Sequence, residues 1–128
     1  MKVKLASVCL CVVLVSVPLM TAAAPAIRGI MHGWRADARR VHEILSDRVP
    51  FDDRVIRTTL QTYISDAGAI EAQIAGKTAA ARDFKQRFMT FAANARTALA
   101  DLGQAPALKK DFARLMSDCQ ACHDAFAH

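Results

Sequence analysis

Cys119, Cys122 and His123 form a C-x-x-C-H run within the last ten residues of this 128-residue chain. The spacing is typical of covalent haem attachment, because two thiols three residues apart can each form a thioether with a haem vinyl group. The adjacent histidine then lies where it can bind the iron as the proximal axial ligand. The motif therefore predicts one haem c per chain, held by Cys119 and Cys122 and ligated by His123.

Other chemistries of a C-x-x-C pair find less support in the chain. A tetrahedral zinc site needs two further ligands, and the other histidines, His32, His42 and His128, lie at no finger-like spacing. A thioredoxin-like motif belongs to a βαβ unit, and no strand pattern is evident. A structural pair of buried thiols stays open as an alternative, but it gives no reason for the histidine that follows.

The first residues have the three-part form of a secretory signal. A short basic start is followed by an apolar run and then by small residues suited to peptidase cleavage. An uncleaved anchor is less favoured, because the run is short for a membrane span of about 20 residues and Pro18 lies near its end. We therefore expect residues 1–23 to be a cleaved signal peptide that contains Cys9 and Cys11. Residues 24–128 would then form a bacterial periplasmic domain without a stable membrane span.

Basic residues outnumber acidic ones by 17 to 12, which gives a formal net charge of +5. Loss of Lys2 and Lys4 with the signal lowers the excess to about +3. Neither a Lys/Arg run nor interleaved aromatic residues suggest a nucleic-acid surface, so no nucleic-acid partner is expected. The early arginines are interpreted as a solvated helix face rather than a docking patch; they are Arg28, Arg35, Arg39 and Arg40.

Four apolar stripes run through the mature region, each stepping by four and three residues. They extend over 27–45, 56–74, 84–102 and 108–126. This spacing places apolar side chains on one face of an amphipathic helix. Because the connections are short, successive helices should be antiparallel neighbours. The chain is therefore predicted to be all-α, an up-down-up-down four-helix bundle that ends in the haem-attachment helix.

Residues between the stripes carry helix start and stop signals. The segment from Asp47 to Pro50 ends the first helix, since the residue before a proline avoids the helical region. Asp52 is a suitable N-cap for the second helix, and Pro106 suits the first turn of the fourth. Gly76 and Gly103 stand where left-handed C-terminal caps are expected.

The bundle topology brings distant residues to the level of the haem. The fourth helix runs opposite to the first, so a rise of about 1.5 Å per residue places Met31 beside His123. Methionine can bind haem iron opposite histidine, which makes Met31 the favoured distal ligand. Phe84 and Phe88 of the third helix share this level and are expected in the haem pocket. The second helix is expected to add Ala67, Ile70 and Ile74 to the wall.

Other candidates for the distal position fit the geometry less well. His32 lies about 100° round the helix from Met31 and off the apolar seam, and Met89 lies off the stripe of the third helix. Met116 shares a helix with His123 and cannot easily reach the opposite face of the ring. Two alternatives stay open: Met31 as simple core packing, and an open distal position.

Together these features resemble the cytochrome c′ family, including its low-spin members. The ending Cys119–Phe126 looks like the family's C-x-x-C-H-x-x-Phe/Tyr tail, and Pro50–Asp52 resembles a Pro-Tyr-Asp segment before the second helix. The resemblance implies a secreted four-helix bundle with covalent haem. It also places Met31 at the family's distal position, which is methionine in low-spin members and commonly leucine in five-coordinate ones.

The resemblance implies roles for two further residues. Arg28 lies within one residue of a first-helix arginine that family members place near a haem propionate. Phe126 is the aromatic residue of the tail and, like Arg28, is expected in the haem pocket. Ala127 departs from the pattern, because a basic residue usually follows that aromatic one. The connection between the second and third helices is also shorter than is typical. A homodimer is compatible with the resemblance.

The predicted function is one-electron transfer by a periplasmic c-type cytochrome with His/Met ligation. Its partners would be the haem and an unidentified periplasmic redox protein. The alternative is a five-coordinate, gas-binding protein of the cytochrome c′ type that takes up nitric oxide. Peroxidase-like catalysis is disfavoured, because no convincing distal acid–base pair lies on the seam, and no enzyme activity is expected.

Overall fold

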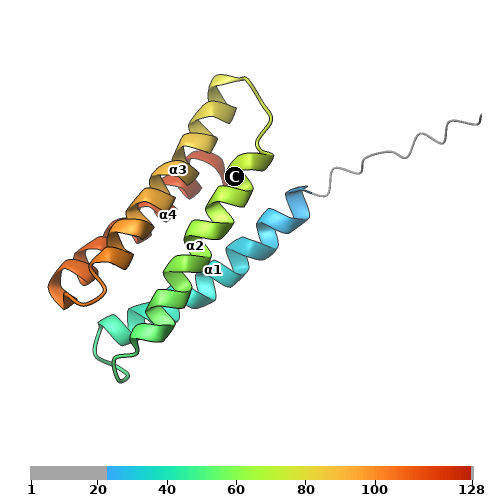
Figure 1. Ribbon diagram of the computed structural model, residues 1–128. Coiled ribbons are helices and arrows are strands. Elements are labelled where there is room, and N and C mark those ends of the chain that lie inside the picture. Colours follow the sequence, from blue (N-terminus) through green and yellow to red (C-terminus); the bar gives the residue numbers. More distant parts are fainter. Residues whose placement is uncertain (1–22, 128) are drawn as a thin grey trace, which may run out of the picture.

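The computed structural model describes residues 23–127, with side-chain environments from residue 27 onward. The four helices are α1 (Ala23–Leu45), α2 (Asp53–Gln73), α3 (Ala79–Ala100) and α4 (Ala105–Phe126), and no strand occurs in this range. Successive helices run antiparallel (Figure 1), which confirms the predicted all-α four-helix bundle. The predicted signal peptide lies outside the described residues except for its last position. None of the helices between residues 23 and 127 is both long and apolar enough to cross a membrane.

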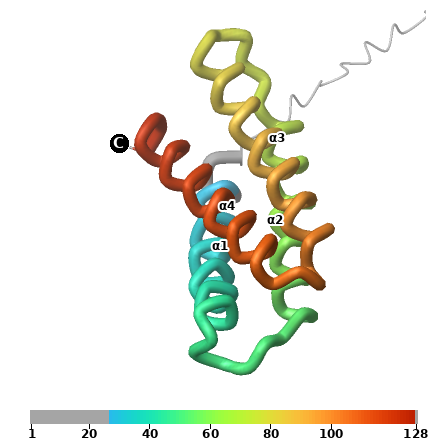
Figure 2. The backbone as a smooth tube through the Cα atoms, turned by 90° about the vertical axis from the view of Figure 1, so that its left-hand side faces the viewer, coloured from blue at the N-terminus to red at the C-terminus, as the bar shows by residue number. Residues whose placement is uncertain are grey.

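The helices pack in chain order around the bundle. α2 packs most extensively against α3, and α3 against α4, whereas α1 meets α4 at few positions. Figure 2 shows α4 running obliquely across the bundle, with its C-terminal end near the level at which α1 begins. The seam between α1 and α4 is therefore the most loosely packed side of the molecule.

One apolar core follows the four predicted stripes. Every residue of the stripes is buried or half-buried, which confirms the helical periodicity. The largest fully buried side chains are Val41, Ile56, Leu60, Tyr63, Ile70, Leu108 and Leu115. Burial of such side chains contributes about 25 cal/mol per Å² of apolar surface, so the stripes hold the bundle together.

The start signals predicted at Asp52 and Pro106 are confirmed, and Thr78 provides a further cap that was not predicted. The Asp52 carboxylate accepts a hydrogen bond of 3.1 Å from the backbone N–H of Val55 at the start of α2. Thr78 caps α3 in the same way through Ala81 N–H, also at 3.1 Å. Pro106 lies in the first turn of α4, where its missing N–H removes no helical hydrogen bond.

The end of α1 depends on a left-handed residue, Asp47, whose φ is 59°. The N–H groups of Asp47 and Arg48 donate to the carbonyls of Ile44 and Glu43 at 3.2 and 3.0 Å. This pair of bonds satisfies the last carbonyls of the helix in the Schellman pattern. The chain therefore leaves α1 sharply and can return along α2.

The prediction of left-handed caps at Gly76 and Gly103 was wrong, because no glycine in the described range has a positive φ. Gly76 meets a different physical requirement. A Cβ at this position would lie 2.7 Å from the Cβ of Ala81, which is closer than two carbon atoms can approach. The absence of a side chain thus allows the α2–α3 connection to pass against the start of α3.

Candidate haem site

A cavity of about 630 Å³ opens at the end of the bundle where α1 begins and α4 ends. Ligand cavities in proteins commonly have volumes of roughly 300–1,000 Å³. The walls come from α1, α3 and α4, while Tyr63 is the single lining residue of α2. Since α1 and α4 pack sparsely, the cavity occupies the side where the bundle is least closed.

Cys119, Cys122 and His123 all line this cavity. Residues three and four positions apart share one face of a helix, so α4 presents these groups together. Both cysteines are half-buried and free of disulfide bonds, while His123 is exposed. The predicted attachment motif therefore borders a cavity of the size that a bound cofactor needs.

The cavity wall raises the pKa of both thiols. Burial raises the pKa of Cys119 to about 11, and the nearby carboxylate of Asp118 adds to the shift. Burial also raises the pKa of Cys122, while the guanidinium of Arg87 opposes this change. The thiolate is the nucleophilic form of cysteine, so both thiols have low spontaneous reactivity.

Met31 of α1 lines the cavity as a half-buried side chain. The neighbouring candidate His32 is exposed and is not among the lining residues. Met89 is 46% exposed on α3. Met116 also lines the cavity, about two helical turns before His123 on the same helix. The structure thus brings Met31 to the same cavity as His123, from a different helix.

The three phenylalanines predicted for the pocket lie together on its wall. Phe84 and Phe88 of α3 and Phe126 of α4 are all lining residues. The ring centroid of Phe84 lies 5.1 Å from that of Phe88 and 4.9 Å from that of Phe126, at steep interplanar angles. The first pair is edge-to-face and the second is tilted, and edge-to-face packing stabilises aromatic pairs. They form a continuous apolar surface beside the cysteines.

A second aromatic group, not predicted for this site, forms the inner end of the cavity. Trp34 stacks on Phe91 at 4.8 Å and lies 5.0 Å from Tyr63. The indole N–H donates to Asp66 at 2.9 Å, and the Tyr63 hydroxyl donates to the carbonyl of Trp34 at 3.0 Å. These contacts join α1, α2 and α3. Trp34 lies one turn from Met31 on the same apolar stripe. Its place in the cavity wall could have been predicted from this position.

The predicted contribution of α2 to the cavity was wrong. Ala67, Ile70 and Ile74 do not line it, and the first two are buried in the bundle core. The physical reason is that α2 lies diagonally from α4, with no direct packing between the two helices. A long side chain is needed to reach the cavity from α2, and Tyr63 supplies it; burial raises the pKa of its hydroxyl.

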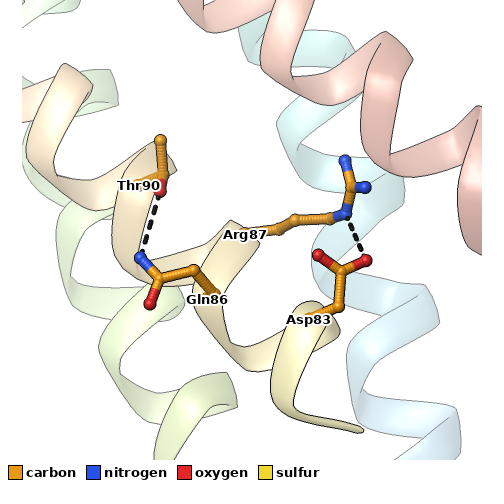
Figure 3. A network of polar contacts seen from close by, with 4 residues as sticks. All are labelled: Asp83, Gln86, Arg87 and Thr90. Atoms are coloured by element: carbon orange, nitrogen blue, oxygen red, sulfur yellow. Dashed lines mark hydrogen bonds and ion pairs between the residues drawn. The ribbon is translucent and has the colours of Figure 1, made fainter. Parts of the chain in front are cut away.

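The arginines that line the cavity are not the one that the resemblance implies. Arg28 is exposed and is not a lining residue, whereas Arg35 and Arg87 are. Arg87 leaves α3 on the side opposite Gln86 (Figure 3) and pairs with Asp83 at 3.1 Å. Its guanidinium carbon also lies 5.6 Å from the centre of the Phe126 ring, a cation–π distance. Arg87 is therefore fixed near Cys122 by two contacts.

Asp118 is the acidic residue of the lining, and its carboxylate is already engaged. It accepts a hydrogen bond of 2.7 Å from the Asn94 amide, which ties α4 to α3 one residue before Cys119. Among residues 23–127, no three His, Cys, Asp or Glu side chains gather as a metal site. The groups present fit a large, mainly apolar ring that binds through two sulfur atoms and one or two axial ligands.

Comparison of the chain with protein-family models, with curated proteins and with solved structures finds no match.

Proposed function

We propose that this chain is a periplasmic c-type cytochrome that carries one covalently bound haem and transfers single electrons. The observation that carries the proposal is the meeting of two ligand sets at one cavity. Cys119, Cys122 and His123 reach it from α4, and Met31 reaches it from α1. A haem iron supplies reversible one-electron chemistry when bound. The protein determines how the iron is held, ligated and shielded.

Cys119 and Cys122 would hold the haem through thioethers. Each thiol would add across a vinyl double bond and pass its hydrogen to the neighbouring carbon, so attachment would need no external oxidant. His123 from α4 and Met31 from α1 would bind the iron. Methionine as a ligand raises the reduction potential relative to a second histidine.

The other lining residues would set the environment of the iron. The wall of Phe84, Phe88 and Phe126 excludes water, and solvent exposure is one of the factors that tune a redox centre. Arg35 and Arg87 are the two arginines of the lining. Guanidinium groups pair well with carboxylates, so these residues would offset the negative charge of the two haem propionates.

Covalent attachment is tested by producing the chain with its signal in a bacterium that carries the c-type maturation machinery. The haem should stay with the polypeptide through acid–acetone extraction and denaturing electrophoresis. Cys119→Ala and Cys122→Ala should weaken this retention, whereas Met89→Ala, at an exposed position outside the cavity, should not. Free extraction of the haem from the matured wild type would refute the proposal.

Distal ligation is tested through Met31. The oxidised wild type should be low-spin with a weak near-infrared methionine-to-iron band, and carbon monoxide should bind slowly to the reduced form. Met31→Ala should give a high-spin ferric spectrum and faster binding, while Met116→Ala should leave ligation unchanged. A wild type that is already high-spin, with fast binding, would replace electron transfer by gas binding. Loss of the low-spin state in His32→Ala alone would indicate bis-histidine ligation.

A further inference from the structure

A row of arginine and histidine side chains follows one flank of α1, and its fixed positive charges come from three arginines. Its members step by four and three residues and are all exposed: Arg28, His32, Arg35, Arg39 and His42. This is the spacing of one helix face, displaced by one residue from the apolar stripe that enters the core. We call these five residues the cationic flank. None of its positions holds an acidic or an apolar residue.

The cationic flank lies on the cavity side of α1. Arg35 lines the cavity between α1, α3 and α4. The opposite flank of α1 carries Asp37 and Arg40, which border a small cleft against α2. The two clefts thus identify the side to which each flank is turned. The cationic flank runs along the loosely packed α1–α4 seam.

No carboxylate of the described side chains neutralises the arginines of this flank. The ion pairs between residues 27 and 127 involve Arg57, Lys85, Arg87, Lys109 and Arg114. Asp37 and Glu43, the acidic residues of α1, lie at positions outside the row. Beside the cavity the flank therefore presents three arginines that form no ion pair with a described side chain. The four early arginines are all exposed, as expected of a solvated face, and Arg40 lies outside the flank.

We propose that the cationic flank is the docking surface for an acidic electron-transfer protein. The inference rests on the proposed function and adds the surface through which the electron is exchanged. Charge complementarity accelerates encounter and orients the partners. A partner with carboxylates around its own redox centre would be held against α1, and its centre would face the cavity. Electron transfer would then occur across the α1–α4 seam.

An acidic protein fits this surface better than an anionic membrane does. Interfacial helices insert large apolar side chains beside their basic residues. The exposed large apolar residues of the described chain are Val49, Phe51 and Met89, and all lie outside α1. The apolar face of α1 is turned into the bundle core. The flank therefore offers charge without a group that would enter a bilayer.

Two small oxidants test the proposal on the haem-loaded protein. Hexacyanoferrate(III) is an anion and tris(phenanthroline)cobalt(III) is a cation, and each takes one electron from the reduced protein. Arg28→Glu/Arg39→Glu reverses two charges of the flank outside the cavity lining. At low salt this variant should react about tenfold more slowly with the anion, a change within the range of electrostatic steering, and faster with the cation. Arg28→Gln/Arg39→Gln should change both rates in the same directions, but less.

Arg96→Glu/Lys110→Glu is the matched control, because both residues are exposed and lie toward the other end of the bundle. It changes the net charge equally and should alter each rate by less than about twofold. Equal slowing by both double variants would overturn the docking proposal, since net charge alone would then explain the rates. No electron transfer to either oxidant would instead refute the proposed function.

A protein probe separates a docking surface from a membrane surface. The haem-loaded wild type should bind flavodoxin, an acidic flavoprotein, at low salt, and binding should weaken as salt is added. The flank variant should lose at least about tenfold in affinity, while the control variant should not. Binding to phosphatidylglycerol vesicles without binding to flavodoxin would overturn the proposal in favour of a lipid surface.

Discussion

The two ends of the bundle use the same sequence pattern with different results. Toward the α1–α2 and α3–α4 connections, stripe residues such as Val41, Ile56 and Leu108 are completely buried. At the other end, residues of the same stripes, such as Phe84 and Phe126, are only half-buried and line a cavity. An apolar face that continues beyond the protein core marks a binding surface. In the proposed function this surface holds the haem, beside the C-x-x-C-H motif.

The boundary between the closed and the open end lies at Trp34. This residue is 7% exposed and belongs to the core, yet it also lines the cavity. Its bonds to Asp66 and from Tyr63 hold α1 against α2 at this level. Substitutions on the two sides of Trp34 should therefore differ in how they respond to the cofactor.

The largest expected difference compares Leu108→Ala with Phe126→Ala. Leu108 is fully buried at the closed end, so its truncation should cost about 2–5 kcal/mol with or without haem. Phe126→Ala should lower the free energy of unfolding by about 1 kcal/mol or less in the haem-free chain. The loss should be larger once a haem packs against the Phe126 ring. Denaturant unfolding of both forms measures the four values. Equal costs of Phe126→Ala in the two forms would show that the cofactor does not occupy the open end.

A smaller effect is expected from pH, because the raised pKa of Cys119 favours the protonated, folded chain. In the haem-free protein this contribution is present below pH 9 and is lost as pH rises toward about 11. The loss should be on the order of 2 kcal/mol. It should vanish in Cys119→Ala and in the haem-loaded protein, since a thioether has no proton to lose.

Ionisation of Tyr63 also lowers the stability of the protein at high pH, and this loss must be separated from that of Cys119. The pKa of Tyr63 is raised above the ordinary value of 10 by burial, so its own contribution to stability is also lost at high pH, starting near pH 10. That loss should occur in both the haem-free and the haem-loaded protein. A haem-loaded protein that loses as much stability as the haem-free chain between pH 9 and 11 would show that the Cys119 sulfur is not attached.

The smallest effect is expected at the boundary. Trp34→Phe keeps an aromatic ring but removes the hydrogen bond to Asp66, which should cost about 1 kcal/mol in either form. Asp66→Ala removes the same bond from the other side, so the double variant should cost less than the sum of the two single ones. Strict additivity, measured by denaturant unfolding, would show that the bond does not link α1 to α2 in solution.

The fold and the common helix face of Cys119, Cys122 and His123 could be predicted because they depend on local spacing. Apolar residues spaced by four and three positions predict one face of an α-helix. The Asp52 cap of α2 is also local, because its hydrogen bond reaches a residue only three positions away. The level of Met31 followed from helix rise and antiparallel topology. The reach of Tyr63 into the cavity could not be predicted in this way, because it depends on α2 and α4 being diagonal. The contact of Arg87 with Phe126 likewise depends on the packing of two helices.

The turns illustrate the same limit. Gly76 and Gly103 occupy positions typical of left-handed caps, but the left-handed residue is Asp47. Aspartate adopts this conformation more readily than most side chains do, and the surrounding backbone bonds stabilise it at the end of α1. The need for glycine at position 76 comes from Ala81, a neighbour brought near by the path of the loop.

The separation of the ligands between two helices has a kinetic consequence. In the proposed function, both thioethers and the proximal histidine come from five consecutive residues, Cys119 to His123, while Met31 comes from α1. Local opening of the sparse α1–α4 seam costs less than global unfolding and would uncover the distal side. A non-covalent cofactor would dissociate during such openings. With two carbon–sulfur bonds, the lifetime of the proposed complex would not depend on how often the seam opens. An exogenous ligand could then reach the iron without release of the haem.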